Sequence, residues 1–467
     1  MAVKSWLKRS ALLFLPLSLL SGCSPYHSSP GPQVKPLSED EEVRISREFR
    51  REAKKILKLV RHPEIERYVD GVGRRLLSAI GPQPFDYRFF IVENSQLNAF
   101  AVPGGTIYIH TGLLERIGST DDLAGVLGHE IIHIKSRHAA RLSGPDPINL
   151  LALLGVFLGA GGPGAQAAGV VAQALAVTRM LSYSRQMEQE ADTLGVKLMV
   201  EAGYDPRAAL NFFKIVERER LLNPVDLPPY LMTHPLTQER IARVEGAIRS
   251  FSPSRSASDY PDPVKRIQTI LRLQRDGAED ATTEQERLLS QEPQKAGLLH
   301  LLSLAYHAKG KWPQAREGYE KTRALDPKSP GIDRDLGRLY TQIGEFALAH
   351  AALERSLSAE PREALNYLSL GELLEKESNF QAAAGAYLQA HSLAPLWAEP
   401  PQRLGIVYGK MKRLGDAYYY LGRSQLLQDE DEKAIADLER ALKTFDATSP
   451  RGQMIREEIE AIKARLR

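Results

Sequence analysis

The C-terminal part of the chain repeats with a period of 34 residues, and this period constrains the fold more than any other feature. Prolines, a Leu-Gly pair and an alanine recur at that interval. The recurring positions are Pro293, Pro327, Pro361 and Pro395; Leu336-Gly337, Leu370-Gly371 and Leu404-Gly405; and Ala315, Ala349, Ala383 and Ala417. Small residues let two helices approach closely and proline closes each unit, so the spacing predicts a stack of helix pairs.

This period and these columns are the tetratricopeptide (TPR) pattern, and we expect an all-α TPR solenoid over residues 263–467. Leu421-Gly422 restarts the pattern 17 residues early. One helix there is expected to end one repeat and begin the next. Residues 450–466 are then the capping helix that such arrays require.

The first 22 residues have the composition of a signal peptide. Lys4, Lys8 and Arg9 precede an apolar run of ten residues at 11–20. A membrane-spanning helix needs about 20 apolar residues, so this run fits a signal-peptide core instead.

The sequence Leu20-Ser21-Gly22-Cys23 resembles a bacterial lipobox, whose cysteine is lipidated and becomes the first residue of the mature chain. Ser24 favours the outer membrane, by resemblance to enterobacterial sorting. We therefore expect a signal peptide at 1–22, a lipid anchor on Cys23 and a flexible tether at 23–36. An ordinary cleaved signal with an incidental cysteine is the alternative.

Charge and cysteine content exclude several classes of function. The single cysteine rules out an internal disulfide and any Cys-cluster metal site. The formal charge of +3 comes from the three basic residues of the first 22, which contain no acidic residue, and the remaining chain carries 58 of each sign. A neutral chain gives no support for a nucleic-acid partner.

The sequence predicts that residues 37–250 form a mostly helical domain with a small antiparallel sheet. A linker at 251–262 separates this domain from the repeats. Two short strands are joined through Pro103-Gly104-Gly105, which suggests a hairpin. The expected elements are a helix within 38–79, strands at Tyr87–Val92, Asn98–Val102 and Thr106–His110, and a helix at Thr120–Arg141. The Gly/Ala/Leu-rich stretch 145–177 is either a packed helical pair or a mobile, membrane-touching cover.

His129-Glu130-Ile131-Ile132-His133 lies within the last of these helices. Residues four apart on a helix point the same way, so His129 and His133 can share one zinc ion. Glu130 lies beside them, where a carboxylate can act on the attacking water. Five successive residues therefore predict a zinc hydrolase site.

A second acidic helix follows near residue 184. Glu188 and Asp192 are four residues apart and share one face, whereas Glu190 points elsewhere. An open zinc site has three protein ligands, and Glu188 is the best candidate for the third. Asp192 is placed to orient a ligating histidine or to help with protons.

Together these motifs resemble the peptidase family of HtpX and the CAAX prenyl protease. The matching residues are Asn98-Ala99-Phe100-Ala101, Pro103-Gly104-Gly105, Thr111-Gly112-Leu113-Leu114, the His129–His133 motif, and Ser184-Arg185 with Glu188, Ala191 and Asp192. With a lipobox and C-terminal TPRs, the chain is similar to BepA-like periplasmic metallopeptidases. The resemblance implies a gluzincin fold, zinc on His129, His133 and Glu188, catalysis by Glu130, and quality control of outer-membrane proteins.

Thr233-His234-Pro235 matches a further motif of that family. His234 either stabilises the oxyanion or occupies the fourth zinc position as a latch, and the sequence leaves both roles open. His138 lies about half a turn from His129 on the helical wheel and is not expected to be a ligand. His110 belongs to no motif.

We expect an outer-membrane-anchored periplasmic zinc endopeptidase that degrades misassembled envelope or outer-membrane proteins. The TPR face would bind unfolded clients or an outer-membrane assembly machine. The substrate would lie extended against the Asn98–Val102 or the Thr106–His110 strand. The rival interpretation is a chaperone or scaffold with a latched protease site, and a third is a housekeeping protease for lipoproteins or signal remnants.

Overall fold

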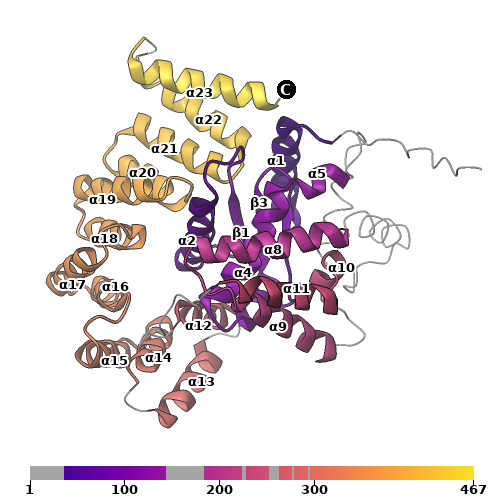
Figure 1. The fold of residues 1–467 in the computed structure, drawn as a ribbon. Coiled ribbons are helices and arrows are strands. Elements are labelled where there is room, and N and C mark those ends of the chain that lie inside the picture. Colours follow the sequence, from indigo (N-terminus) through magenta and orange to yellow (C-terminus); the bar gives the residue numbers. More distant parts are fainter. Residues whose placement is uncertain are drawn as a thin grey trace, which may run out of the picture.

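The computed structural model describes residues 36–142, 184–222, 228–251, 262–275, 278–292, 295–446 and 448–466. A globular part is followed by a curved array of helices that runs around its side (Figure 1). The predicted signal peptide, Cys23, the tether and the 145–177 stretch lie outside the described residues. None of the described helices has the length and apolar character that crossing a membrane requires.

The globular part holds the three strands and the helices that surround them. Ser38 begins the first helix with a capping box to Glu41, and Pro63 occupies the first turn of the second. The elements are α1 (Glu39–Ile56), α2 (Pro63–Ile80), β1 (Arg88–Val92), β2 (Ala99–Val102), β3 (Thr106–His110), α3 (Thr111–Arg116), α4 (Thr120–Lys135), α5 (His138–Leu142), α8 (Arg185–Glu201), α9 (Ala208–Leu222), α10 (Pro229–Thr233), α11 (Gln238–Arg249) and α12 (Pro263–Arg275).

The sheet has the strand order β1-β3-β2. The predicted hairpin is confirmed, because β2 pairs with β3 in antiparallel register, Ala99 opposite Ile109. The expectation of a wholly antiparallel sheet is wrong, because β1 pairs with β3 in parallel, Arg88 opposite Thr106. The central strand β3 is therefore paired on both sides, and β1 and β2 are the edges.

The turn between β2 and β3 needs glycine. Gly104 and Gly105 have φ of 84° and 102°, a region that side chains rarely adopt. A Cβ on Gly104 would stand 2.2 Å from the Glu42 carbonyl oxygen of α1. The Pro-Gly-Gly sequence thus fixes both the tight turn and the close approach of α1.

Apolar layers cover both faces of the sheet. On one face α1 contributes Phe49, whose ring centroid lies 5.5 Å from that of Tyr108, and Tyr108 stacks on Phe100 at 5.1 Å. On the other face α2, α4, α8 and α9 form one continuous core with β1 and β3. This core buries nearly all of α4, the helix that carries the metal-binding motif.

The first helix beyond the linker, α12, belongs to that same core through Val264, Ile267, Ile270 and Leu271. The amide of Gln268 also donates to the Ile117 carbonyl oxygen at 2.8 Å. The repeat region is therefore joined to the globular part by shared packing as well as by the chain.

The array is built from paired helices. Gly337, Gly371 and Gly405 each lie where a Cβ would meet the second helix of the pair, at 2.6, 2.4 and 2.6 Å. The helices are α13 (Ala278–Gln291), α14 (Ala296–Ala308), α15 (Trp312–Leu325), α16 (Ile332–Ile343), α17 (Phe346–Ala359), α18 (Ala364–Lys376), α19 (Phe380–Leu393), α20 (Glu399–Lys410), α21 (Leu414–Leu427), α22 (Asp431–Leu442) and α23 (Pro450–Leu466).

The early restart of the repeat is explained by α21. Gly405 of α20 faces Leu421 of α21, and Gly422 of α21 faces Leu438 of α22 in the same manner. As predicted, α21 therefore ends one helix pair and begins the next. The final helix, α23, buries Ile455, Ile459 and Ile462 against this end of the array.

Ion pairs tie the array to the globular part near both of its ends. Arg50 of α1 binds Asp429 with an Nη2–Oδ1 distance of 2.8 Å, beside α22. Glu64 of α2 accepts from Arg266 at 2.6 Å and from Arg338 of α16 at 3.0 Å. The inner side of the curve consequently faces α2 and β1 (Figure 1).

Candidate metal centre

The centre is built on α4, whose start is strongly fixed. Ser119 and Asp122 form a capping box, and Asp262 accepts from the backbone N–H of Thr120 at 2.9 Å. One turn apart near the end of the helix, His129 and His133 place their Nε2 atoms 3.0 Å from each other. The predicted pair of imidazoles therefore does point to one place.

The second helix of the site, α8, crosses α4 at small residues. A Cβ on Gly195 would stand 3.3 Å from the backbone N of His129, so glycine lets the two helices approach. This approach brings Glu188 to the histidines, with Oε1 3.3 Å from His133 Nε2 and Oε2 3.6 Å from His129 Nε2. The predicted third ligand thus joins the pair.

His234 completes the group from the segment after α10. Its ring stacks on Tyr230 with centroids 4.6 Å apart. Its Nδ1 lies 2.9 Å from Glu188 Oε1 and 3.4 Å from His129 Nε2. One donor atom from each of the four buried side chains lies within 4.8 Å of the others.

These separations fit a tetrahedral metal site. Zinc–ligand bonds of about 2.0–2.1 Å place tetrahedral donors about 3.3 Å apart. Five of the six residue pairs among His129, His133, Glu188 and His234 have donor atoms 2.9 to 3.6 Å apart, counting either Glu188 oxygen, and one donor atom from each residue lies within 4.8 Å of the others. Three imidazoles and one carboxylate are also a donor set that zinc accepts.

Glu130 lies beside this group and is fully buried. Neither of its carboxylate oxygens has a hydrogen-bond partner among the described residues. Burial raises the pKa of Glu130, while the neighbouring His234 and His129 act in the opposite direction. Its Oε1 lies 3.5 Å from His234 Nε2, so the carboxylate faces the metal-binding group.

Asp192 supports His129 from behind. Its Oδ1 lies 3.1 Å from His129 Nδ1, which leaves Nε2 directed at the group. Arg240 of α11 holds Asp192 through two hydrogen bonds of 2.7 and 2.8 Å, and it also lies 2.7 Å from Glu188 Oε2. Burial by itself raises the pKa of Asp192, but Arg240 and His129 bring it below its ordinary value.

His129 and Glu188 each shift the pKa of the other. Burial alone would lower the pKa of His129, but Asp192 and Glu188 raise it to about 10. Burial alone would raise the pKa of Glu188, but the histidines around it hold the pKa well below its ordinary value. Glu188 is therefore ionised, which suits a cation, whereas His129 has to release a proton when a metal binds.

His138 supports the other histidine, and the sequence analysis missed this role. As predicted, His138 is not among the grouped donors, but its Nδ1 lies 2.9 Å from His133 Nδ1. Its Nε2 lies 3.3 Å from Glu190 Oε2. A helical wheel could not show the contact with His133, because α4 ends at Lys135 and the chain turns at Arg137, which has φ of 53°.

Arg240 was also missed as a functional residue. The sequence showed it only as a member of the helix after His234. Thr237 caps that helix and accepts from the Arg240 backbone N–H, so the arginine occupies its first turn, close to the histidine. The sequence signal for this role was an arginine six residues after a candidate metal-site histidine, in the first turn of the next helix.

Three family models match the chain. "Peptidase family M48" matches residues 63–248, and "Tetratricopeptide repeat" matches residues 334–395. "Est1 DNA/RNA binding domain" matches residues 383–463, which carry 11 basic and 12 acidic side chains. The last match therefore brings no excess of positive charge with it.

The chain is 31% identical over 233 residues to the beta-barrel assembly-enhancing protease of Yersinia pestis, covering 48% of each chain. It is 29% identical over 194 residues to the mitochondrial metalloendopeptidase OMA1 of Schizosaccharomyces pombe, covering 41% of this chain and 56% of that one. It thus spans about half the length of the curated relatives it matches. Among solved structures, MamA is 23% identical with a TM-score of 0.31, covering 36% of this chain and 96% of that one.

Proposed function

We propose that the protein is a zinc-dependent endopeptidase, because residues 63–248 match the model of peptidase family M48. The family implies a metal ion, and His129, His133 and Glu188 are the residues proposed to hold it as zinc. The convergence of these buried donors on one point is the observation that carries the proposal. A zinc ion bound there supplies Lewis-acid polarisation of the scissile carbonyl.

Glu130 is the proposed general base. Its carboxylate is buried beside the ligands and faces them, with Oε1 3.5 Å from His234 Nε2, so it is placed to accept a proton. It takes one from the attacking water and returns it to the leaving amine. Asp192 acts by orienting His129, from which it lies 3.1 Å away.

The substrate is proposed to pair with β2. Of the two strands considered from the sequence, β3 already has partners on both sides, whereas β2 is an edge. The backbone of Ala101 in β2 also acts on the pKa of Glu130, which supports this edge as the one beside the proposed catalytic carboxylate. Pairing through backbone hydrogen bonds gives little sequence selectivity, as a protease for unfolded proteins needs.

His234 is proposed as a latch that occupies the fourth ligand position. Its Nδ1 stands 2.9 Å from Glu188 Oε1 and 3.4 Å from His129 Nε2, within the donor group itself. An oxyanion-stabilising group would instead stand beyond the ligands, facing the substrate carbonyl. Removing the ring, as in His234→Ala, should raise peptide cleavage, whereas an oxyanion role predicts a loss.

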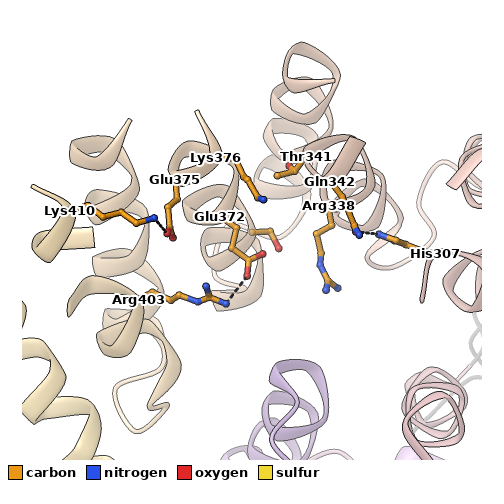
Figure 2. Close-up of a pocket in the computed structure, with 10 residues that line it drawn as sticks. His307, Arg338, Thr341, Gln342, Glu372, Glu375, Lys376, Arg403 and Lys410 are labelled. Atoms are coloured by element: carbon orange, nitrogen blue, oxygen red, sulfur yellow. Dashed lines mark hydrogen bonds and ion pairs between the residues drawn. The ribbon is translucent and has the colours of Figure 1, made fainter. Parts of the chain in front are cut away.

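The repeat array is proposed to bind clients or an assembly machine. Its inner side has a groove of about 550 Å³, lined by the first helices of successive repeats (Figure 2). Gln342, Lys376 and Lys410 occupy one repeat position, 34 residues apart. Lys410 pairs with Glu375 at 2.6 Å and Arg403 with Glu372 at 3.5 Å, and the polar lining as a whole holds four basic side chains against two carboxylates.

The substrates and the location are proposed from the names of the relatives. A beta-barrel assembly-enhancing protease is among them, which supports degradation of misassembled envelope or outer-membrane proteins. The same names support an envelope location, with a lipid anchor at Cys23 proposed from the sequence alone. The latch geometry favours a second candidate, a chaperone or scaffold whose protease is silent until His234 leaves.

The test is digestion of a urea-unfolded outer-membrane barrel protein by zinc-loaded protein. Glu130→Gln should retain zinc and lose at least about 100-fold in cleavage rate, because a positioned base contributes that much. Cleavage by the pure Glu130→Gln protein at the wild-type rate would contradict the mechanism. Rescue of an outer-membrane assembly defect by Glu130→Gln would favour the chaperone candidate.

A further inference from the structure

The other edge strand, β1, also has backbone groups available for pairing. The N–H of Arg88 donates to the Gly105 carbonyl at 2.8 Å, so residue 88 and alternate residues face β3. Ile91 and Glu93 face outward, where the Ile91 carbonyl accepts from Val60 at 2.9 Å and the Glu93 N–H donates to Lys58 at 2.7 Å.

Phe89 is the next outward-facing residue along this edge. The chain that covers Ile91 and Glu93 turns away at His62 to begin α2. In this alternation the backbone N–H and C=O of Phe89 face away from β3, and no loop, turn or cap hydrogen bond among the described residues involves them. An extended segment placed here would continue the pairing that Leu59 begins opposite Val92.

This edge opens into a cavity between the peptidase domain and the repeat array. The cavity has a volume of about 370 Å³, within the range of ordinary ligand sites. Phe89 and Phe90 line it from β1, and Leu396, Trp397 and Leu427 line it from the array. Its two sides are tied together, because Arg88 Nη1 donates to the Leu427 carbonyl oxygen at 3.2 Å.

The charged residues of the cavity affect which side chains a bound segment can carry. Four arginines and two carboxylates line it: Arg61, Arg67, Arg74, Arg88, Glu66 and Asp70. Asp70 is shared by Arg74 at 3.1 Å and Arg67 at 3.4 Å. Arg61 pairs with Glu66 at 3.3 Å and Arg88 with Asp429 at 3.6 Å, so Arg67 and Arg74, which share one carboxylate, are the positive charges that favour an acidic residue in the bound segment.

We propose that this cavity is a second binding site for client protein, which takes an extended segment as an added strand on β1. Backbone pairing to Phe89 supplies the register, and an apolar side chain contacts Leu396 and Trp397. The chemistry fits an amphipathic β-strand with flanking acidic residues. The proposal rests on the proposed function, since it adds a client-holding site to the protease.

This site is separate from the catalytic edge. In the order β1-β3-β2, the strand β3 lies between the two edges, so they are about 10 Å apart in the plane of the sheet. A client strand on β1 leaves β2 free for the segment to be cut. One polypeptide could therefore be held at β1 while another part of it occupies β2.

The test is binding of a fluorescent peptide that alternates phenylalanine and threonine and carries a glutamate at each end. All proteins carry Glu130→Gln so that the peptide stays intact. Leu396→Asp should weaken binding about tenfold, because it removes the apolar contact and places a negative charge beside an acidic peptide. The matched control is Leu388→Asp, at a leucine of α19 that is 37% exposed and outside the cavity lining.

Two peptides with N-methyl groups on alternate amides test the backbone pairing. One phase should bind like the parent, and the other should lose binding, because it removes the N–H that faces Phe89. Equal binding by Leu396→Asp and Leu388→Asp, or equal binding of both methylated peptides, would overturn the proposal. Since binding is read without cleavage, failure of the protease mechanism and failure of this site give different results.

Discussion

The peptidase domain and the repeat array are both mostly helical, but they use buried side chains differently. In the domain, buried charged groups from α4, α8 and α11 converge on one point. In the array, apolar side chains form separate clusters between neighbouring helices. A convergent site depends on each of its members, whereas a solenoid distributes its stability over local interfaces.

The largest effect on folding is expected at Arg240 in the domain. Arg240→Gln leaves Asp192 and Glu188 without their shared cation, and loss of a buried partner costs about 3–5 kcal/mol. Urea unfolding of the metal-free protein would measure this change. Arg243→Gln, at a side chain 43% exposed on the same helix, is the control and should change stability by less than about 0.5 kcal/mol. Equal effects would remove the contrast between the two regions.

A smaller effect, specific to metal affinity, is expected at His138. His138→Ala removes the group 2.9 Å from His133 Nδ1, and such supporting groups contribute about 10–100-fold to metal affinity. Zinc competition with a chelating dye would measure it. His138→Asn keeps a hydrogen-bond acceptor and should recover part of the affinity. An unchanged zinc affinity in His138→Ala would assign this histidine to packing alone.

In the array, a substitution is expected to lower the stability only where two helices are in contact. Gly371→Ala places a Cβ 2.4 Å from the Tyr387 ring and should destabilise by about 1–3 kcal/mol. Gly385→Ala, at a helical glycine with no atom within 4 Å, should be neutral or slightly stabilising. Thermal unfolding of both variants would measure the difference. Peptide cleavage by Gly371→Ala should remain at the wild-type rate while the array is folded.

The smallest effect concerns acid sensitivity, which should be greater in the domain. Burial lowers the pKa of His110 to about 4, so the unfolded chain takes up a proton between pH 6.5 and 4 that the folded chain does not. The free energy of unfolding therefore falls as pH falls through this window. His110→Gln should make the slope shallower by roughly 1 kcal/mol per pH unit near pH 5–6. Urea unfolding of the wild type and of His110→Gln between pH 5 and pH 7 would measure this difference.

The sequence predicted what depends on spacing within one element. His129 and His133, or Glu188 and Asp192, share a face because they are four residues apart on one helix. The 34-residue period likewise predicted the helix pairs and the double use of α21. These relations are local, so the helical geometry alone determines them.

Relations between elements were not available from the sequence. The parallel pairing of β1 with β3 joins two strands that are separated along the chain by β2, and no local sequence pattern encodes it. The contact of His138 with His133 depends on the turn at Arg137. The pairing of Glu64 with Arg338 depends on how the array curves around the domain, which the repeat period does not specify.

X-ray absorption at the zinc edge tests the central claim, that His129, His133, Glu188 and His234 form one metal site. The account predicts one zinc per chain with four nitrogen or oxygen neighbours at about 2.0–2.1 Å. In His234→Ala it predicts the loss of one imidazole from that shell with the zinc retained. A protein without zinc, or an identical shell in His234→Ala, would contradict it.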